Sequence, residues 1–265
     1  MDQDISRILA GWEYVPGDLN VRVVDGNDGR RKIQVRMDLG LMQLEWSGRP
    51  DARRPHGCTT LLEYYREKHR RWEREHPGQP FVLSRKDCWA LSQEAATYYW
   101  RRISFFRLKE YERAERDAVH NLAILNLCWK YAGHDEDRAM AEHHTPFVTA
   151  HRFQARAMRH LARDDYMGSI REIHAGIACI EGYLREAGHF DRIEACPEIR
   201  FLRDWEEELQ QQRPLTEHEQ LRSDLEEAVA CDEFEKAAVL RDKLQQLEAG
   251  TDDPEGEEDE ATEAE

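Results

Sequence analysis

The spacing of hydrophobic residues divides the chain into a short N-terminal part and a long helical part. In the first 50 residues, apolar and polar positions alternate on both sides of the turn residues Asp25–Gly29 and again after Gly40. The apolar members of these runs are Val21, Val23, Ile33, Val35, Met37, Met42, Leu44 and Trp46. Alternation with a period of two is typical of strands with one buried face. The pattern predicts a three-stranded antiparallel meander within a first domain of residues 1–58.

From Thr60 onward the apolar residues recur at helical spacing. One face of the first helix is formed by Leu61, Leu62, Tyr65, His69 and Trp72, and Pro77 and Gly78 end it. Thr60 with Glu63, and Ser84 with Asp87, have the spacing of helix N-terminal caps. We therefore expect a mainly α fold in which residues 59–210 form a helical body.

Two segments of this body resemble the corner of a tetratricopeptide hairpin. They are the EYERA segment at 110–114 and the DYMGSI segment at 165–170, each between two helical stretches. The corners are 55 residues apart, whereas the tetratricopeptide period is about 34. Arg102 also stands where that motif has a small residue. The sequence predicts an irregular, tetratricopeptide-like array of helical hairpins; an all-α bundle without a peptide groove is the alternative.

The residues before the C-terminus predict a separate helical hairpin at 215–249. Thr216 and Glu219 form a capping box, and an apolar stripe follows at Leu221, Leu225, Ala228 and Val229. Residues 231–233 interrupt the stripe, and a second one runs from Phe234 through Ala237, Ala238, Leu244 and Leu247 to Gly250. The pattern predicts two short antiparallel helices, with Phe234 at the start of the second.

This hairpin resembles the UVR motif, which occurs at the C-terminus of UvrB, inside UvrC, and in McsA and ClpC-type ATPases. The FEKAAVLRDKL string at 234–244 carries most of the likeness, and Gln34–Pro50 resembles a block in bacterial proteins that end in such a motif. The resemblance implies protein docking through Leu221, Leu225, Phe234, Ala237, Ala238, Leu240, Arg241 and Leu244. It implies a partner with a UVR-like or other helical surface, such as UvrB or UvrC in nucleotide excision repair, or a second copy. An adaptor role in Clp or McsA proteolysis is the alternative.

Charge is unevenly distributed along the chain. The net charge is −16, and nine acidic residues without a base follow Gly250, so we expect residues 250–265 to be a disordered acidic tail. The segment 49–86 is basic instead, which makes it a candidate for anion or nucleic-acid binding. Its candidate residues are Arg49, Arg53, Arg54, Arg70, Arg71 and Arg74. Alternatively these bases are solvated or paired with Glu63, Glu67, Glu73 and Glu75.

Residues that carry enzyme chemistry are not arranged in any familiar motif. The sequence has no Walker A loop, GxGxxG or GxSxG, and its six cysteines form no CxxC pair. Histidines gather at His134, His143, His144 and His151 without a metal-binding spacing, and we expect residues 132–149 to be a solvated interhelical loop. We therefore expect a cytoplasmic, non-enzymatic protein with no cofactor and no metal. No apolar run is long enough to suggest a membrane span.

Overall fold

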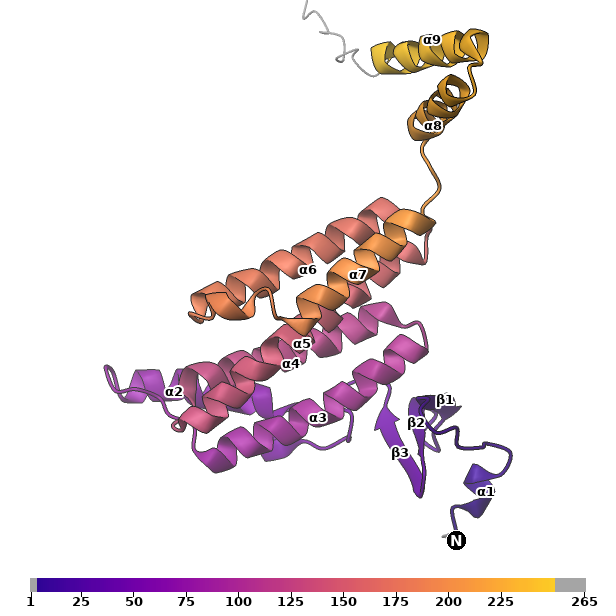
Figure 1. The fold of residues 1–265 in the computed structure, drawn as a ribbon. Coiled ribbons are helices and arrows are strands. Elements are labelled where there is room, and N and C mark those ends of the chain that lie inside the picture. Colours follow the sequence, from indigo (N-terminus) through magenta and orange to yellow (C-terminus); the bar gives the residue numbers. More distant parts are fainter. Residues whose placement is uncertain (1–3, 251–265) are drawn as a thin grey trace, which may run out of the picture. The chain divides into compact units, whose positions relative to one another are not determined.

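The alternating N-terminal runs form the predicted meander. A computed structural model describes residues 4–250 of the chain (Figure 1). A short helix, α1 (Ser6–Leu9), precedes the strands β1 (Asn20–Asp25), β2 (Arg31–Met37) and β3 (Gly40–Glu45), which pair antiparallel in the order β1-β2-β3. Ile33 lies opposite both Val23 and Leu44, so the apolar positions share one face. The predicted sheet is confirmed.

The inner face of this sheet packs against the helix α3 (Arg85–Arg107). Ile33, Leu44 and Trp46 are buried with Phe105 of that helix, and the rings of Trp46 and Phe105 meet edge to face at 5.3 Å. Edge-to-face contact is a favoured geometry for aromatic pairs because the positive ring edge faces the negative ring face. This cluster joins the meander to the helical body.

After the sheet, the chain is mainly helical as far as Gln212. They are α2 (Leu61–Glu75), α3, α4 (Tyr111–Tyr131), α5 (Asp135–Leu161), α6 (Tyr166–Glu186) and α7 (Pro197–Gln212), with short 3-10 turns at Pro55–Gly57 and Phe190–Arg192. The side chain of Thr60 accepts a hydrogen bond from the Glu63 amide, and Ser84 and Asp87 form a reciprocal capping box. Both predicted caps are therefore present. Within residues 4–250 the fold is mainly α, as the periodicity predicted.

Three helical hairpins turn through the same corner. These hairpins are α3–α4, α5–α6 and the C-terminal pair α8 (Glu217–Ala230) and α9 (Phe234–Gly250). In each corner, a residue with positive φ lies two positions before the aromatic residue that opens the next helix. These residues are Lys109, Asp164 and Asp232, with φ of 59°, 57° and 59°. The amide that follows each one donates to a carbonyl five residues earlier, in the pattern that closes a helix C-terminus. The two tetratricopeptide-like corners are thus helix-capping turns.

The prediction of an interhelical loop at 132–149 is wrong. The helix α5 begins at Asp135 and continues through Pro146 to Leu161. Its first turn holds Asp135, Glu136 and Asp137, and carboxylates in this position are stabilised by the positive end of the helix dipole. The many polar residues therefore lie on the solvated face of a helix, and Ala141, Val148 and Thr149 are buried on its other side.

Besides the cluster between the sheet and α3, the helical body contains two further core clusters. Figure 1 shows the helices that enclose them. The first lies between α2, α3 and α4 and is built around Leu62, Leu83, Leu91 and Ile124. The second lies between α5, α6 and α7 and is built around Ile173, Ile180, Leu184, Ile199 and Leu202. None of the helices within residues 4–250 has the length and apolar character needed to cross a membrane.

A second compact unit begins at Gln211, and the first one ends at Gln210. Within the described residues the second unit consists of the helices α8 (Glu217–Ala230) and α9 (Phe234–Gly250), which pack against each other. The predicted C-terminal helical pair is confirmed. The acidic tail at 251–265 lies outside the described residues.

Candidate functional site

The first turn of α8 is held by the predicted capping box and by one arginine. Thr216 Oγ1 accepts from the Glu219 amide, and the Thr216 amide donates to Glu219 Oε2 at 2.9 Å. Arg213 Nη1 donates to the same carboxylate at 2.7 Å. These hydrogen bonds, with Arg213 first, lower the pKa of Glu219 to about 2. The carboxylate therefore stays ionised at a lower pH than an ordinary glutamate, and its hydrogen bonds satisfy the Thr216 amide at the start of the hairpin.

Small residues let the two helices of the hairpin approach closely. Ala228 on α8 is fully buried, and Ala237 and Leu240 on α9 are buried against it. Leu221 and Leu225 pack on this cluster from α8, and Leu244 is buried farther along α9. Five of the eight residues predicted to bind a partner, Leu221, Leu225, Ala237, Leu240 and Leu244, thus form the interior of the hairpin itself.

The other three predicted residues face solvent. Phe234 is 67% exposed, and Ala238 and Arg241 are exposed on the following turns of α9. Arg241 Nη2 lies 3.3 Å from Asp242 Oδ1. Phe234 is therefore not part of the hairpin interior, and its ring is available for contact with another molecule.

Two more apolar residues of the hairpin are exposed and were not predicted as partner-binding. Val229 and Val239 are 52% and 57% exposed. Val229 belongs to the apolar stripe of α8 in the sequence, but the buried positions of that helix are occupied by Leu221, Leu225 and Ala228. Val229 and Val239 can be recognised because they are apolar but do not fall at the buried positions of their helices. Those buried positions are known only from the packing of the two helices.

The match to a family model decides how this hairpin is classified. The model described as UVR, the UvrB/uvrC motif, matches residues 216–250, which are both helices of the hairpin with its capping box and turn. The protein contains a UVR motif. The motif covers about an eighth of the chain and indicates a role in protein interaction or DNA repair. No curated protein and no solved structure matches the chain.

The predicted basic residues before α2 are split between the interior and the surface. Arg49 is largely buried: its Nη1 lies 3.0 Å from Glu94, and its Nε lies 2.8 Å from Asp51. Glu94 is fully buried and also accepts hydrogen bonds from the Leu61 and Leu62 amides at the start of α2. Arg49 thus neutralises a carboxylate of the protein itself. Arg53 and Arg54 are exposed in the loop.

The basic residues of α2 do not pair with the glutamates that alternate with them. Glu63 accepts hydrogen bonds from Thr59, and Glu73 pairs with His69 at 3.5 Å. Among the described residues Arg70, Arg71 and Arg74 form no ion pair, and all three are exposed. The predicted pairing along the helix is therefore absent for these arginines.

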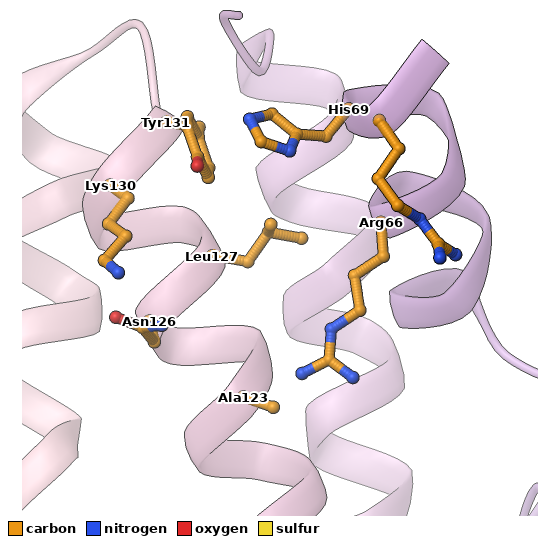
Figure 2. A pocket seen from close by; sticks show the side chains of 8 residues that line it. Arg66, His69, Ala123, Asn126, Leu127, Lys130 and Tyr131 are labelled. Atoms are coloured by element: carbon orange, nitrogen blue, oxygen red, sulfur yellow. The ribbon is translucent and has the colours of Figure 1, made fainter. Parts of the chain in front are cut away.

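A basic groove of about 460 Å³ lies between α2 and α4. Figure 2 shows Arg66 and His69 of α2 facing Asn126, Lys130 and Tyr131 of α4. Arg70 also lines it, and no acidic residue does. In this groove part of the predicted basic region forms a concave surface. Arg71 and Arg74 do not line this groove.

The histidine cluster is dispersed by the helix that contains it. His134 precedes α5, and His143 and His144 lie on its exposed side with ring centroids 5.3 Å apart. His151 lies about two turns further along the helix. Burial and the charge of Arg102 lower the pKa of His151 to about 3. Within residues 4–250, no three His, Cys, Asp or Glu side chains come together as a metal site.

Proposed function

We propose that this protein is a non-enzymatic interaction protein that docks onto another helical protein through the outer surface of its UVR hairpin. The observation that carries the proposal is the 67% exposure of Phe234 at the start of α9. Val229 and Val239 add apolar surface to the same hairpin. Exposed aromatic residues are frequent anchors of protein interfaces.

The small interior of the hairpin supports the same proposal. Its buried cluster consists of Ala228, Ala237 and Leu240, with Leu221 and Leu225 packed around it. Chains below about 40 residues usually need disulfides, a metal or a partner for stability. A partner helix that covers Phe234 would bury further apolar surface on the outside of the hairpin and stabilise it.

UvrB or UvrC is the partner that we favour, because each carries a motif of the same family and would offer a matching helical surface. This partner would link the protein to nucleotide excision repair. The alternative is an adaptor role in regulated proteolysis, with McsA or a ClpC-type ATPase as partner. Self-association through two UVR hairpins is a third arrangement of the same surface.

The test compares two phenylalanines of equal exposure. Phe234→Ala in the full chain is expected to lower affinity for the partner roughly thirtyfold or more, as interface anchors contribute about 2 kcal/mol or more. Because the ring is exposed, the melting temperature should change little. Binding is measured by biolayer interferometry against purified UvrB, UvrC, McsA and a ClpC-type ATPase, and self-association by sedimentation velocity.

Phe190→Ala is the matched control, because Phe190 is 66% exposed in the other compact unit. It should leave partner binding unchanged. Equal loss of affinity in both variants, or full binding by Phe234→Ala, would contradict docking through the hairpin. Which of the four proteins is bound distinguishes the repair role from the adaptor role.

A second candidate function is direct nucleic-acid binding by the basic region. The observation that favours it is the groove in Figure 2, which Arg66, Arg70 and Lys130 line without a carboxylate among the lining residues. Such a groove attracts phosphate groups electrostatically and without sequence preference. Of the remaining predicted residues, Arg53, Arg54, Arg71 and Arg74 are exposed and do not line the groove, whereas Arg49 is engaged by Glu94.

A further inference from the structure

Two consecutive arginines of α3 are buried, and their surroundings differ. Arg101 donates to both carboxylate oxygens of Asp117, at 2.7 and 2.8 Å, and to two backbone carbonyls. Arg102 is also fully buried, but it forms no ion pair with a described carboxylate. No described protein atom accepts a hydrogen bond from its Nε or Nη1. A buried guanidinium is costly unless it is paired and hydrogen-bonded.

Aromatic rings compensate only part of this cost. The guanidinium carbon of Arg102 lies 5.5 Å from the ring of Tyr99 and 5.9 Å from that of Phe147. Cation–π contacts of this kind are weaker than a carboxylate pair. Burial lowers the pKa of Arg102 to about 10, which leaves the side chain charged at neutral pH. The charge of Arg102 also helps to keep the nearby His151 neutral.

Arg102 lines a cavity of about 400 Å³ between α3, α4 and α5. Most of its walls are apolar, and no Asp or Glu contributes to them. The apolar walls come from Ala95, Ala96, Tyr99, Leu125, Met140, Phe147 and Val148. Asn121 also lines the cavity; its amide nitrogen donates to the Ala95 carbonyl at 3.1 Å, and its buried Oδ1 has no donor among the described residues.

The charge and size of the cavity define the kind of ligand it suits. One guanidinium matches one carboxylate, because the planar donor fork fits two coplanar oxygens, whereas a phosphate dianion is better matched by several cations. The volume lies near the lower end of the roughly 300–1,000 Å³ that small-molecule sites span. Apart from Arg102, Asn121, Ser92 and His144, the lining residues are apolar, and they suit an apolar body.

We propose that the cavity between α3, α4 and α5 binds a small amphipathic monocarboxylate, with the carboxylate on Arg102 and the apolar body between Tyr99, Leu125 and Phe147. The Asn121 Oδ1 is placed to accept a hydrogen bond from a hydroxyl or amide group of the ligand. This site is separate from the UVR hairpin and is independent of the proposed docking function.

Octanoate is the probe that tests the site, with 1-octanol as its uncharged match. Isothermal titration of the full chain should show saturable octanoate binding at least roughly tenfold tighter than octanol binding, since hydrogen bonds to a charged group supply the difference. No binding at millimolar octanoate, or equal binding of the acid and the alcohol, would overturn the proposal.

Arg102→Met separates ligand binding from a structural role of the arginine. Methionine has similar length and no charge, so octanoate affinity should fall roughly tenfold or more while the melting temperature of the ligand-free protein stays the same or rises. A purely structural arginine would give the opposite result, a lower melting temperature. Arg107→Met, an exposed arginine on the same helix, should change neither quantity.

Ala96→Phe tests the same site while Arg102 is retained. Ala96 lines the cavity but is itself exposed, so the larger ring should obstruct the cavity without affecting the core. Octanoate and octanol binding should then both be lost. Octanoate binding that persists in Ala96→Phe, or in Arg102→Met, would place the ligand elsewhere and overturn the proposal.

Discussion

At the scale of single residues, buried charges decide how the N-terminal sheet is attached. Arg101 reaches from α3 to the carbonyls of Glu45 and Gly48 at 3.0 and 2.8 Å, and Asp117 on α4 balances its charge. One guanidinium thereby satisfies backbone groups of the sheet and a carboxylate of the helical body. In the sequence, Arg101 and Asp117 do not differ from the many exposed charges, so this contact was not predicted.

Asp117→Asn is expected to lower the free energy of unfolding by about 3–5 kcal/mol, because it leaves Arg101 buried without a carboxylate. The amide has nearly the same size, so the effect would come from charge and not from a cavity. Denaturation by urea measures the change. Arg116→Ala is the control: Arg116 is half exposed and its nitrogen lies 3.9 Å from Asp117, so its loss should cost less than about 1 kcal/mol.

The same residue scale explains why the predicted site residues separated into two groups. Ala237 and Phe234 belong to one apolar stripe, yet Ala237 is buried against α8 and Phe234 is exposed. Periodicity identifies an apolar face on each helix of the hairpin. Each helix buries only part of its apolar face against the other, and the rest stays exposed. The division of the face depends on the crossing of α8 and α9, which the sequence pattern does not specify.

At the scale of elements, the recurring corner is the main structural device of the chain. Lys109, Asp164 and Asp232 each adopt a left-handed backbone conformation that closes one helix before an aromatic residue opens the next. Aspartate tolerates this conformation better than lysine, because its short side chain can hydrogen-bond locally. Lys109 is therefore the most strained of the three corners.

Lys109→Gly is expected to stabilise the protein by about 0.5–1 kcal/mol, since glycine adopts a positive φ without strain. That gain corresponds to a rise in melting temperature of roughly 1–4 °C for a protein of this size, measured by circular dichroism. Lys109→Ala keeps the Cβ atom and should show no gain. An equal rise in both variants would mean that the lysine side chain, not the backbone, is unfavourable.

Element boundaries followed the sequence wherever a cap marked them. Thr60, Ser84 and Thr216 each start the helix that their spacing predicted. No such cap marks the start of α5, because His134 forms no side-chain cap hydrogen bond, and the polar stretch after it has the composition of a loop. Helical periodicity was present there, but Pro146 and the adjacent histidines obscured it.

At the scale of the whole molecule, charge separates the basic groove from the acidic C-terminus. The groove between α2 and α4 has Arg66, Arg70 and Lys130 on its rim, while nine acidic residues follow Gly250 in a chain of net charge −16. Like a nucleic acid, this acidic segment carries dense negative charge. Its removal changes the net charge of the chain from −16 to −7, which weakens the overall repulsion of phosphate groups.

Nucleic-acid binding, if it occurs, should therefore fall steeply with salt and rise when the tail is removed. A chain ending at Gly250 should shift single- or double-stranded DNA in a gel at 50 mM salt and lose roughly a hundredfold or more in affinity at 200 mM. Arg66→Glu with Arg70→Glu should abolish the shift, and Arg222→Glu, a 70% exposed arginine of the hairpin, should not. No shift at the lower salt concentration removes this function.

The sequence alone determined the classes of element and their order, because backbone periodicity and helix caps are local properties. It predicted the three strands, the helical body, the C-terminal helical pair and its UVR motif, all of which residues 4–250 confirm. Only the tertiary structure decided which apolar residues of the hairpin remain exposed, that Arg49 pairs with Glu94, and that Arg102 faces an apolar cavity. These features depend on contacts between residues distant in sequence, and local patterns carry no information about them.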